Sequence, residues 1–303
     1  MAEYHILPCQ RALHELGRRV PYHWDLNLYR GCEHGCRYCY AMYSHRYLDT
    51  EDYFGHIYAK TDILEALERE LSSPSWKREV VNIGGVTDSY QPAEAHYRLM
   101  PEVLRLLIRY KTPAIISTKS ELVLRDYDLI DQLSRITYVN VAATVTTMDE
   151  SVRSLLESGA VPSLRRFEML TQFRKTNAST GLHVMPIIPY LTDSYENIDA
   201  LFAAARESRV HYCLPGTLYL RGQTRKVFFR FIDQHYPHLS APLHDLYKTG
   251  GAPKGYKDAL YQMVGERRAH YGLTGSYAKP MKEKMAQALK ENAQVAFNLG
   301  SQN

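Results

Sequence analysis

The feature that most constrains the fold of this chain is an alternation of short β-rich runs with longer stretches of helical periodicity. Runs rich in β-branched and aromatic residues predict strands, and they lie at residues 25–29, 80–84, 114–118, 139–144, 182–187 and 210–220. Alternating strands and helices favour a parallel sheet. Six units in about 210 residues predict an α/β fold, a partial (β/α)6 barrel of the TIM type, because a full eight-stranded barrel takes about 250 residues.

Three of the intervening helices have clear signals. Apolar residues recur on one face from Ile63 onward, and Asp62 before them is a candidate cap. A second helical pattern begins at Leu99, with Pro101 in its first turn. A third follows Asp193. These helices are expected to cover the sheet.

The chain after residue 229 reads differently. It is helical and polar, and a Gly/Pro break at residues 250–253 precedes predicted helices at 256–271 and 280–297. We expect three parts: a lead-in segment at residues 1–23 that covers one end of the barrel, the barrel at 24–228, and a helical C-terminal extension at 229–303.

The bulk properties predict a cytoplasmic protein. No run of 18 or more apolar residues occurs, so no membrane span is expected. The first residues lack the basic and apolar regions of a signal peptide. A net charge of +4, spread over segments of mixed sign, permits a nucleic-acid partner without indicating one.

Three of the five cysteines lie close together, at Cys32, Cys36 and Cys39. This pattern argues against a disulfide framework and for metal or redox chemistry. Structural zinc needs four ligands, and His34 inside the loop is a candidate fourth ligand. A [4Fe–4S] cluster on three thiolates leaves one iron open for a further ligand. The spacing favours the cluster, with zinc and plain structural thiols as the alternatives.

The cysteine spacing, with the aromatic Tyr38 directly before the last cysteine, resembles the signature of the radical S-adenosylmethionine (SAM) superfamily. Residues 24–31 and 40–41 resemble more narrowly its spore photoproduct lyase-like branch. The resemblance implies a [4Fe–4S] cluster whose open iron takes the amino and carboxylate groups of SAM. It also implies an electron donor such as flavodoxin or ferredoxin. Members cleave SAM reductively, and the 5′-deoxyadenosyl radical abstracts hydrogen from substrate, so an oxidoreductase or lyase is expected.

The same resemblance implies a SAM-binding segment after the second strand. Gly84, Gly85, Thr87 and Asp88 match the place where members bind the SAM ammonium group. Glycine allows close approach, and Asp88 supplies the opposite charge. The alternative is a glycine-rich turn with a capping aspartate.

Three further residues match SAM contacts of the family. Lys119, at the end of the third strand, resembles a lysine that contacts SAM, although a surface lysine is an equal alternative. Thr144 ends the fourth strand and matches a SAM-contacting hydroxyl residue. Ile188 follows the fifth strand and resembles the apolar segment that holds adenine; on its own it would be core.

Candidates for the substrate side are less specific. Tyr40 and Tyr90 are candidates to face the substrate and relay a hydrogen atom. Cys213, in the sixth strand, is either a hydrogen-atom donor or a buried core cysteine, and Cys9 is read as an incidental thiol.

The sequence departs from the branch at Val86. Spore photoproduct lyases carry there a cysteine that returns hydrogen to the thymine radical, so photoproduct repair is not expected. Glu157, Arg125 and Asp126 match the branch pattern, and ion pairing is their expected role. The substrate stays unidentified. The alternatives are nucleic-acid lesion repair and a non-catalytic zinc or iron–sulfur module.

Overall fold

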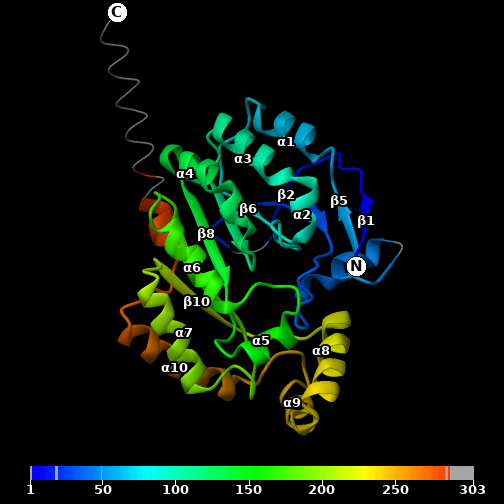
Figure 1. Cartoon of the computed structure of the whole chain (residues 1–303), viewed down its shortest axis with the longest axis vertical. Coiled ribbons are helices and arrows are strands. Elements are labelled where there is room, and N and C mark those ends of the chain that lie inside the picture. The colour runs from blue at the N-terminus through cyan, green and yellow to red at the C-terminus, as the bar shows by residue number, and fades with distance from the viewer. Residues whose placement is uncertain (1, 18–19, 49, 284–285, 287–303) are drawn as a thin grey trace, which may run out of the picture.

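The main sheet of the computed structural model has seven strands in the order β10-β9-β8-β7-β6-β3-β2 (Figure 1). The structure describes residues 2–17, 20–48, 50–283 and 286. Six neighbouring strands are parallel: β3 (Trp24–Leu26), β6 (Val81–Ile83), β7 (Ala114–Thr118), β8 (Val139–Thr144), β9 (Ser179–Ile187) and β10 (Tyr212–Thr217). They confirm the six-unit partial barrel. Within the described residues β10 does not pair with β2, so the barrel stays open.

The β-rich run at residues 25–29 was expected to be one strand and is two. The chain leaves β3 at Asn27, whose side chain accepts a hydrogen bond from the Val86 amide at 2.8 Å. The carbonyl of Leu28 then accepts from the Lys60 amide at 3.0 Å. The following strand therefore joins a second, smaller sheet in the order β1-β5-β4, made of β1 (Glu3–Ile6), β5 (His56–Ala59) and β4 (Tyr29–Arg30).

The lead-in segment contributes to both sheets. Its first strand, β1, lies parallel to β5 in the small sheet. Its second strand, β2 (Leu13–Glu15), pairs antiparallel with β3 at the edge of the main sheet. The segment is thus tied in by backbone pairing.

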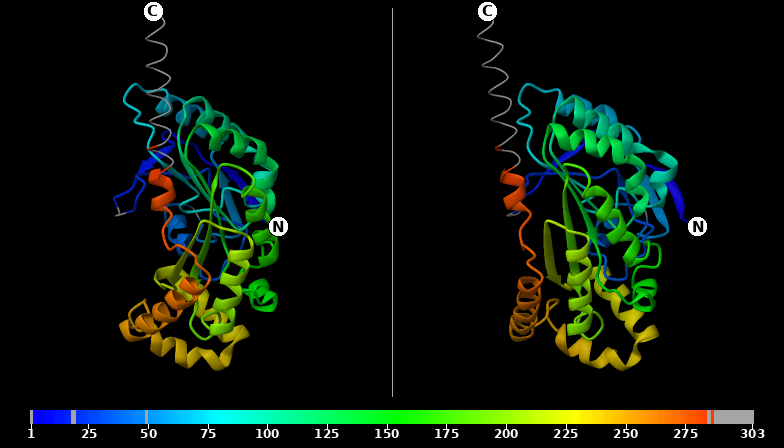
Figure 2. Two further views of the ribbon diagram at one scale, coloured as in Figure 1. Left: turned by 90° about the vertical axis from the view of Figure 1, so that its left-hand side faces the viewer. Right: turned by 60° about the vertical axis from the view of Figure 1, so that its left-hand side comes forward.

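A layer of helices covers the outer face of the main sheet (Figure 1, Figure 2). Its main members are α1 (Ile63–Leu71), α3 (Leu99–Arg109), α4 (Tyr127–Ile136), α6 (Ser163–Phe173) and α7 (Tyr195–Glu207). Shorter helices connect other strands: α2 (Pro92–Tyr97) and α5 (Glu150–Leu156). The predicted cap of α1 is wrong, because the Asp62 carboxylate accepts from the Cys9 amide instead of a helix amide.

The C-terminal part is helical, as expected. It contains α8 (Gly222–His235), α9 (Ser240–Leu246) and α10 (Lys254–His270) at the lower end of the molecule in Figure 1. The expected boundary at residue 229 falls inside α8, and the expected helix at 280–297 lies largely outside the described residues. Within the described residues no helix has the length and apolar character to cross a membrane.

Candidate functional site

The three clustered cysteines lie at the carboxyl edge of the parallel strands. Their loop follows β4 and leads into the short helix η1 (Tyr40–Tyr47). The loops after β6 and β7 reach the same place, where barrel enzymes locate their chemistry. Cys32 and Cys36 are 8% and 6% exposed, and Cys39 is half-buried. Burial raises the pKa of the Cys36 thiol to about 12, so metal binding has to displace its proton.

The spacing of the thiols distinguishes between metals. Among the described residues, only Glu3, His5 and His56 bring three His, Cys, Asp or Glu ligand atoms within 4.8 Å of one another. At least one pair of the three thiols therefore lies more than 4.8 Å apart, whereas tetrahedral zinc holds thiolates about 3.8 Å apart. A [4Fe–4S] cluster binds one thiolate on each of three irons. The donor set fits a cluster better than a single zinc ion.

His34 is not positioned as a zinc ligand. Its Nδ1 lies 3.1 Å from the Gly159 carbonyl oxygen, and its Nε2 lies 3.0 Å from Asp88 Oδ2. Both ring nitrogens therefore lie within hydrogen-bond distance of protein oxygens. His34 thus fastens the cysteine loop to Asp88 and Gly159 through two buried contacts.

The Asp88 carboxylate is fully engaged by the protein. Besides His34, it accepts from the Thr118 hydroxyl at 2.8 Å, the Lys119 amide at 2.8 Å and the Tyr90 amide at 2.9 Å. Burial alone would raise the pKa of Asp88, but His34 and these hydrogen bonds lower it to about 2. Asp88 therefore joins the cysteine loop to the ends of β6 and β7.

A second clamp holds the start of the cysteine loop. The Thr87 hydroxyl and the Gln91 amide group donate to the Gly31 carbonyl at 2.6 and 3.0 Å. Gln91 also accepts from the Glu33 amide at 3.0 Å. Gly31 has a φ of +84° and no room for a side chain, since a Cβ atom would lie 2.6 Å from the His56 carbonyl. These contacts fix the backbone around Cys32.

The glycine pair after β6 leaves space for the Asp25 side chain and contacts Tyr40. A Cβ atom on Gly85 would lie 2.3 Å from Asp25 Oδ2, so the carboxylate occupies that space. The Tyr40 hydroxyl donates to the Gly85 carbonyl, and its ring is 58% exposed. Gly84 has a φ of +87°, which favours glycine. Tyr40 is therefore accessible beside the glycine segment.

Tyr38 connects the loop to a buried ion pair. Its hydroxyl donates to Glu157, which lies 2.6 Å from an Arg166 nitrogen. Both charged side chains are 0% exposed. Arg166 also donates to the Thr144 carbonyl at 2.7 Å. Glu157 thus has the ion-pairing role expected of it, and Arg166 links the cysteine loop to the end of β8.

Lys119 and Thr144 share the inner face of the barrel. Side chains alternate along a strand, which places Thr144 on the same face as Asn140 of β8. Lys119 Nζ lies 5.7 Å from the centre of the Tyr38 ring. Burial opposes its charge, but the nearby Cys36 and Glu157 raise the pKa of Lys119. It is half-buried, which disfavours the surface-lysine alternative.

Ile188 belongs to the apolar cluster that includes Cys36 and Tyr38. It is 0% exposed. Helix α8 closes this side, where the Thr224 hydroxyl donates to the Cys39 carbonyl at 2.7 Å. The C-terminal extension therefore contacts the cysteine loop directly.

Two expected site residues are not brought to an accessible position. Tyr90 is 0% exposed and lies in the core, which does not support a substrate-facing role. Cys213 is also 0% exposed. Its neighbour Tyr212 points inward and donates to Asn140 at 2.9 Å, so Cys213 faces the opposite, helix-covered side among apolar residues such as Leu182.

The expected ion pairs beside α2 are present. Arg125 lies 2.6 Å from Glu94 and 2.7 Å from Asp126. Glu94 is buried and also accepts from the Tyr29 hydroxyl at 2.5 Å. This network supports the strand that leads into the cysteine loop.

Comparison with known proteins agrees with this arrangement. The sequence profile of the radical SAM superfamily matches residues 26–203. The chain belongs to the radical SAM superfamily. The cofactors of that family are a [4Fe–4S] cluster and SAM, and its members are enzymes that need an electron donor and a substrate.

The relatives extend along most of the chain. A protein of Mycobacterium tuberculosis is 34% identical over 280 residues, covering 90% of this chain and 82% of the relative. A protein of Methanocaldococcus jannaschii is 22% identical over 242 residues, covering 80% and 86%. A solved spore photoproduct lyase mutant with bound AdoMet and dinucleoside spore photoproduct matches with a TM-score of 0.64 at 13% identity, covering 88% and 79%. At this identity the match shows a shared fold.

Several residues of the site were not anticipated. Gln91 and Arg166 hold the cysteine loop through buried contacts, and His183 lies on the inner face in register with Thr144. Burial, followed by the nearby Lys119 charge, lowers the pKa of His183 to about 4. The sequence signal for His183 is its place between the apolar Leu182 and Val184, inside the run at 182–187 expected to be a strand.

Proposed function

We propose that this chain is a radical SAM enzyme that reductively cleaves SAM and abstracts a hydrogen atom from a substrate still to be identified. Cys32, Cys36 and Cys39 would hold the [4Fe–4S] cluster. When bound, the cluster and SAM supply an electron and a 5′-deoxyadenosyl radical for the abstraction. Whether the net reaction is an oxidoreduction or a lyase reaction depends on that substrate.

The observation that carries the proposal is the buried three-thiol loop at the carboxyl edge of the sheet. Its thiols are spread more widely than a zinc ion holds its ligands. The only histidine in the loop, His34, uses both ring nitrogens elsewhere. This donor set supports a cluster with one open iron rather than a closed structural zinc site.

The surrounding side chains support distinct roles in this function. Lys119 and Thr144, on the inner face, are proposed to contact SAM, and Ile188 is proposed to pack against its adenine. The carbonyl groups of the glycine segment are proposed to face the SAM ammonium group. Asp88 is proposed to position these groups, because its own oxygens already accept four hydrogen bonds.

The exposed Tyr40 is the better tyrosine candidate for the substrate side. It lies beside Gly85 and directly after Cys39, whereas Tyr90 is enclosed. Flavodoxin or ferredoxin remains the proposed electron donor, and a cytoplasmic location remains a prediction. Thymine photoproduct repair is disfavoured, because Val86 carries no thiol and Cys213 faces the helices.

The test is anaerobic reconstitution of the full chain, followed by incubation with SAM and dithionite. About four irons and four sulfides per chain are expected, with slow release of 5′-deoxyadenosine even without substrate. Cys36→Ala should abolish both signals, and the matched Cys9→Ala should keep both. One zinc per chain and no 5′-deoxyadenosine would instead support the non-catalytic module.

A further inference from the structure

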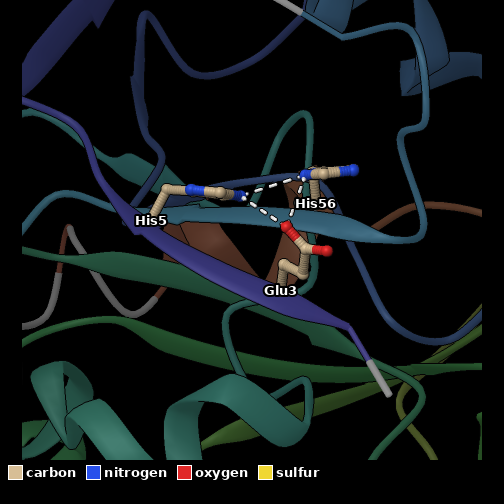
Figure 3. Close-up of side chains that lie close together, drawn as sticks. All are labelled: Glu3, His5 and His56. Atoms are coloured by element: carbon tan, nitrogen blue, oxygen red, sulfur yellow. Dashed lines mark hydrogen bonds and ion pairs between the residues drawn. The ribbon is translucent and has the colours of Figure 1, made fainter.

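A second group of metal-ligating side chains lies on the small sheet, outside the cysteine loop. Glu3, His5 and His56 place one ligand atom each within 4.8 Å of the others (Figure 3). His5 Nε2 lies 3.0 Å from His56 Nδ1. Glu3 Oε2 lies 3.9 Å from the first nitrogen and 3.7 Å from the second. The three atoms form the corners of one small triangle.

The strand pairing explains why these residues meet. Glu3 and His5 are two residues apart on β1 and therefore share a face. Strand β5 lies parallel to β1, and His56 is the register partner of Glu3. The His5 ring also stacks on Tyr58 with ring centres 4.8 Å apart, which orients it. The backbone thus brings all three side chains to one side of the small sheet.

We propose that this group is a binding site for a divalent transition-metal ion, with zinc as the fitting ion. Two imidazoles and a carboxylate are ligands that zinc accepts, with a fourth position left for water. Bonds of about 2.1 Å in a tetrahedron separate the ligands by about 3.4 Å. The separations of 3.0, 3.7 and 3.9 Å bracket that value.

The contact between the two histidines also suits metal binding. Two imidazole nitrogens 3.0 Å apart need one hydrogen between them. A metal ion would take the place of that hydrogen between the two lone pairs, and the hydrogen would move to the other nitrogen of its own ring, so both imidazoles bind as neutral ligands. The partial exposure of the three side chains leaves the ion a path from solvent.

An ion at this position would fasten the lead-in segment next to the cysteine loop. Tyr4, between two of the ligands, donates to the Glu33 carboxylate at 3.1 Å. Glu33 directly follows Cys32. The His56 carbonyl lies directly against Gly31, the residue before Cys32. Occupancy would therefore stabilise the pairing of β1 with β5 beside the loop, and it does not depend on the proposed radical chemistry.

The test uses the full chain after cluster reconstitution, when iron occupies the loop thiols. Zinc is titrated in competition with a chromophoric chelator, and the zinc environment is read by X-ray absorption. One zinc per chain is expected, with nitrogen and oxygen neighbours and no sulfur. His5→Ala and His56→Ala should each weaken binding by at least about tenfold, since even partners that only support a ligand cause such losses.

The controls separate ligand loss from unfolding. His23→Ala, at an exposed histidine of the same lead-in segment, should bind zinc like the unmodified chain. Each variant is compared with the unmodified chain by far-UV circular dichroism and cluster absorption. Glu3→Gln, which retains the side-chain shape, should also weaken zinc binding, and it replaces any histidine variant that misfolds. Sulfur neighbours around zinc, or unchanged affinity in the folded ligand variants, would overturn the proposal.

Discussion

The cysteine loop and Cys213 place thiols in two different environments of the same sheet. The loop thiols lie at the carboxyl edge near Lys119, whose charge opposes the rise that burial causes in the pKa of Cys36. Cys213 lies on the outer face of β10, in the apolar cluster between sheet and helices. Burial raises the pKa of the Cys213 thiol to about 12, as it does that of Cys36, so the neighbours rather than the burial distinguish the two thiols. A cationic neighbour such as Lys119 can stabilise a bound thiolate, whereas an apolar layer keeps a thiol protonated and inert.

The largest expected effect is loss of the cluster from the loop. Clusters of this kind absorb broadly at about 400 nm because of thiolate-to-iron charge transfer. Cys32→Ala, Cys36→Ala and Cys39→Ala should each abolish this absorption. Cys9→Ala and Cys213→Ala should keep it. Anaerobic reconstitution with iron and sulfide counting is the measurement. A cluster that survives Cys36→Ala but is lost in Cys213→Ala would reverse the comparison.

The buried ion pair beside the loop should give the next largest effect. Arg166→Met leaves the Glu157 carboxylate buried without its partner, which typically costs about 3–5 kcal/mol of stability. Arg165, the adjacent residue, pairs with Glu121 at the surface. Arg165→Ala should therefore cost about 0–1 kcal/mol. Denaturant unfolding of both variants measures the difference, and equal losses would show that the pair does not support the loop.

Much of this arrangement is predictable from the sequence, where the signals are local. The bounds of β7 and β8 follow from apolar runs that are almost entirely buried. The three proposed cysteine ligands are predicted from their spacing. The split of the run at residues 25–29 depends on the pairing of Leu28 with Lys60, which the run itself does not encode.

The side-chain clamps are not predictable in this way. His34 and Asp88 lie 54 residues apart, and nothing in either local sequence indicates that the ring faces the carboxylate. The same holds for Cys213. Its strand was expected, but the face of the sheet on which its side chain lies depends on the register of β10 against β9. A one-residue change of register would turn that thiol inward.

Asp88→Ala should have an effect of intermediate size, which distinguishes positioning of the loop from direct SAM binding. Asp88→Ala removes an acceptor shared by four donors, and hydrogen bonds to a charged group contribute roughly 1.5–3 kcal/mol each. The loop should then bind less iron during reconstitution. SAM affinity, compared at matched iron content, should stay unchanged if Asp88 only positions the loop. A fall in that affinity by roughly 1.5–3 kcal/mol would restore Asp88 as a direct SAM contact.

The smallest expected effect is that of Cys213→Ala on chemistry. A thiol that donates hydrogen to a substrate radical has to face the site, and Cys213 faces the helices behind the sheet. Val86, at the position of the branch cysteine, packs against Cys32 and Tyr53 and offers no comparably weak bond to hydrogen. The chain is therefore expected to release 5′-deoxyadenosine at the same rate with or without the Cys213 thiol, and not to repair an oligonucleotide carrying the spore photoproduct. The measurement is incubation of both proteins with SAM, dithionite and that oligonucleotide. Multiple-turnover recovery of thymines that is lost in Cys213→Ala would mean that β10 turns its thiol inward during turnover, and the distinction between the two thiol environments would fail.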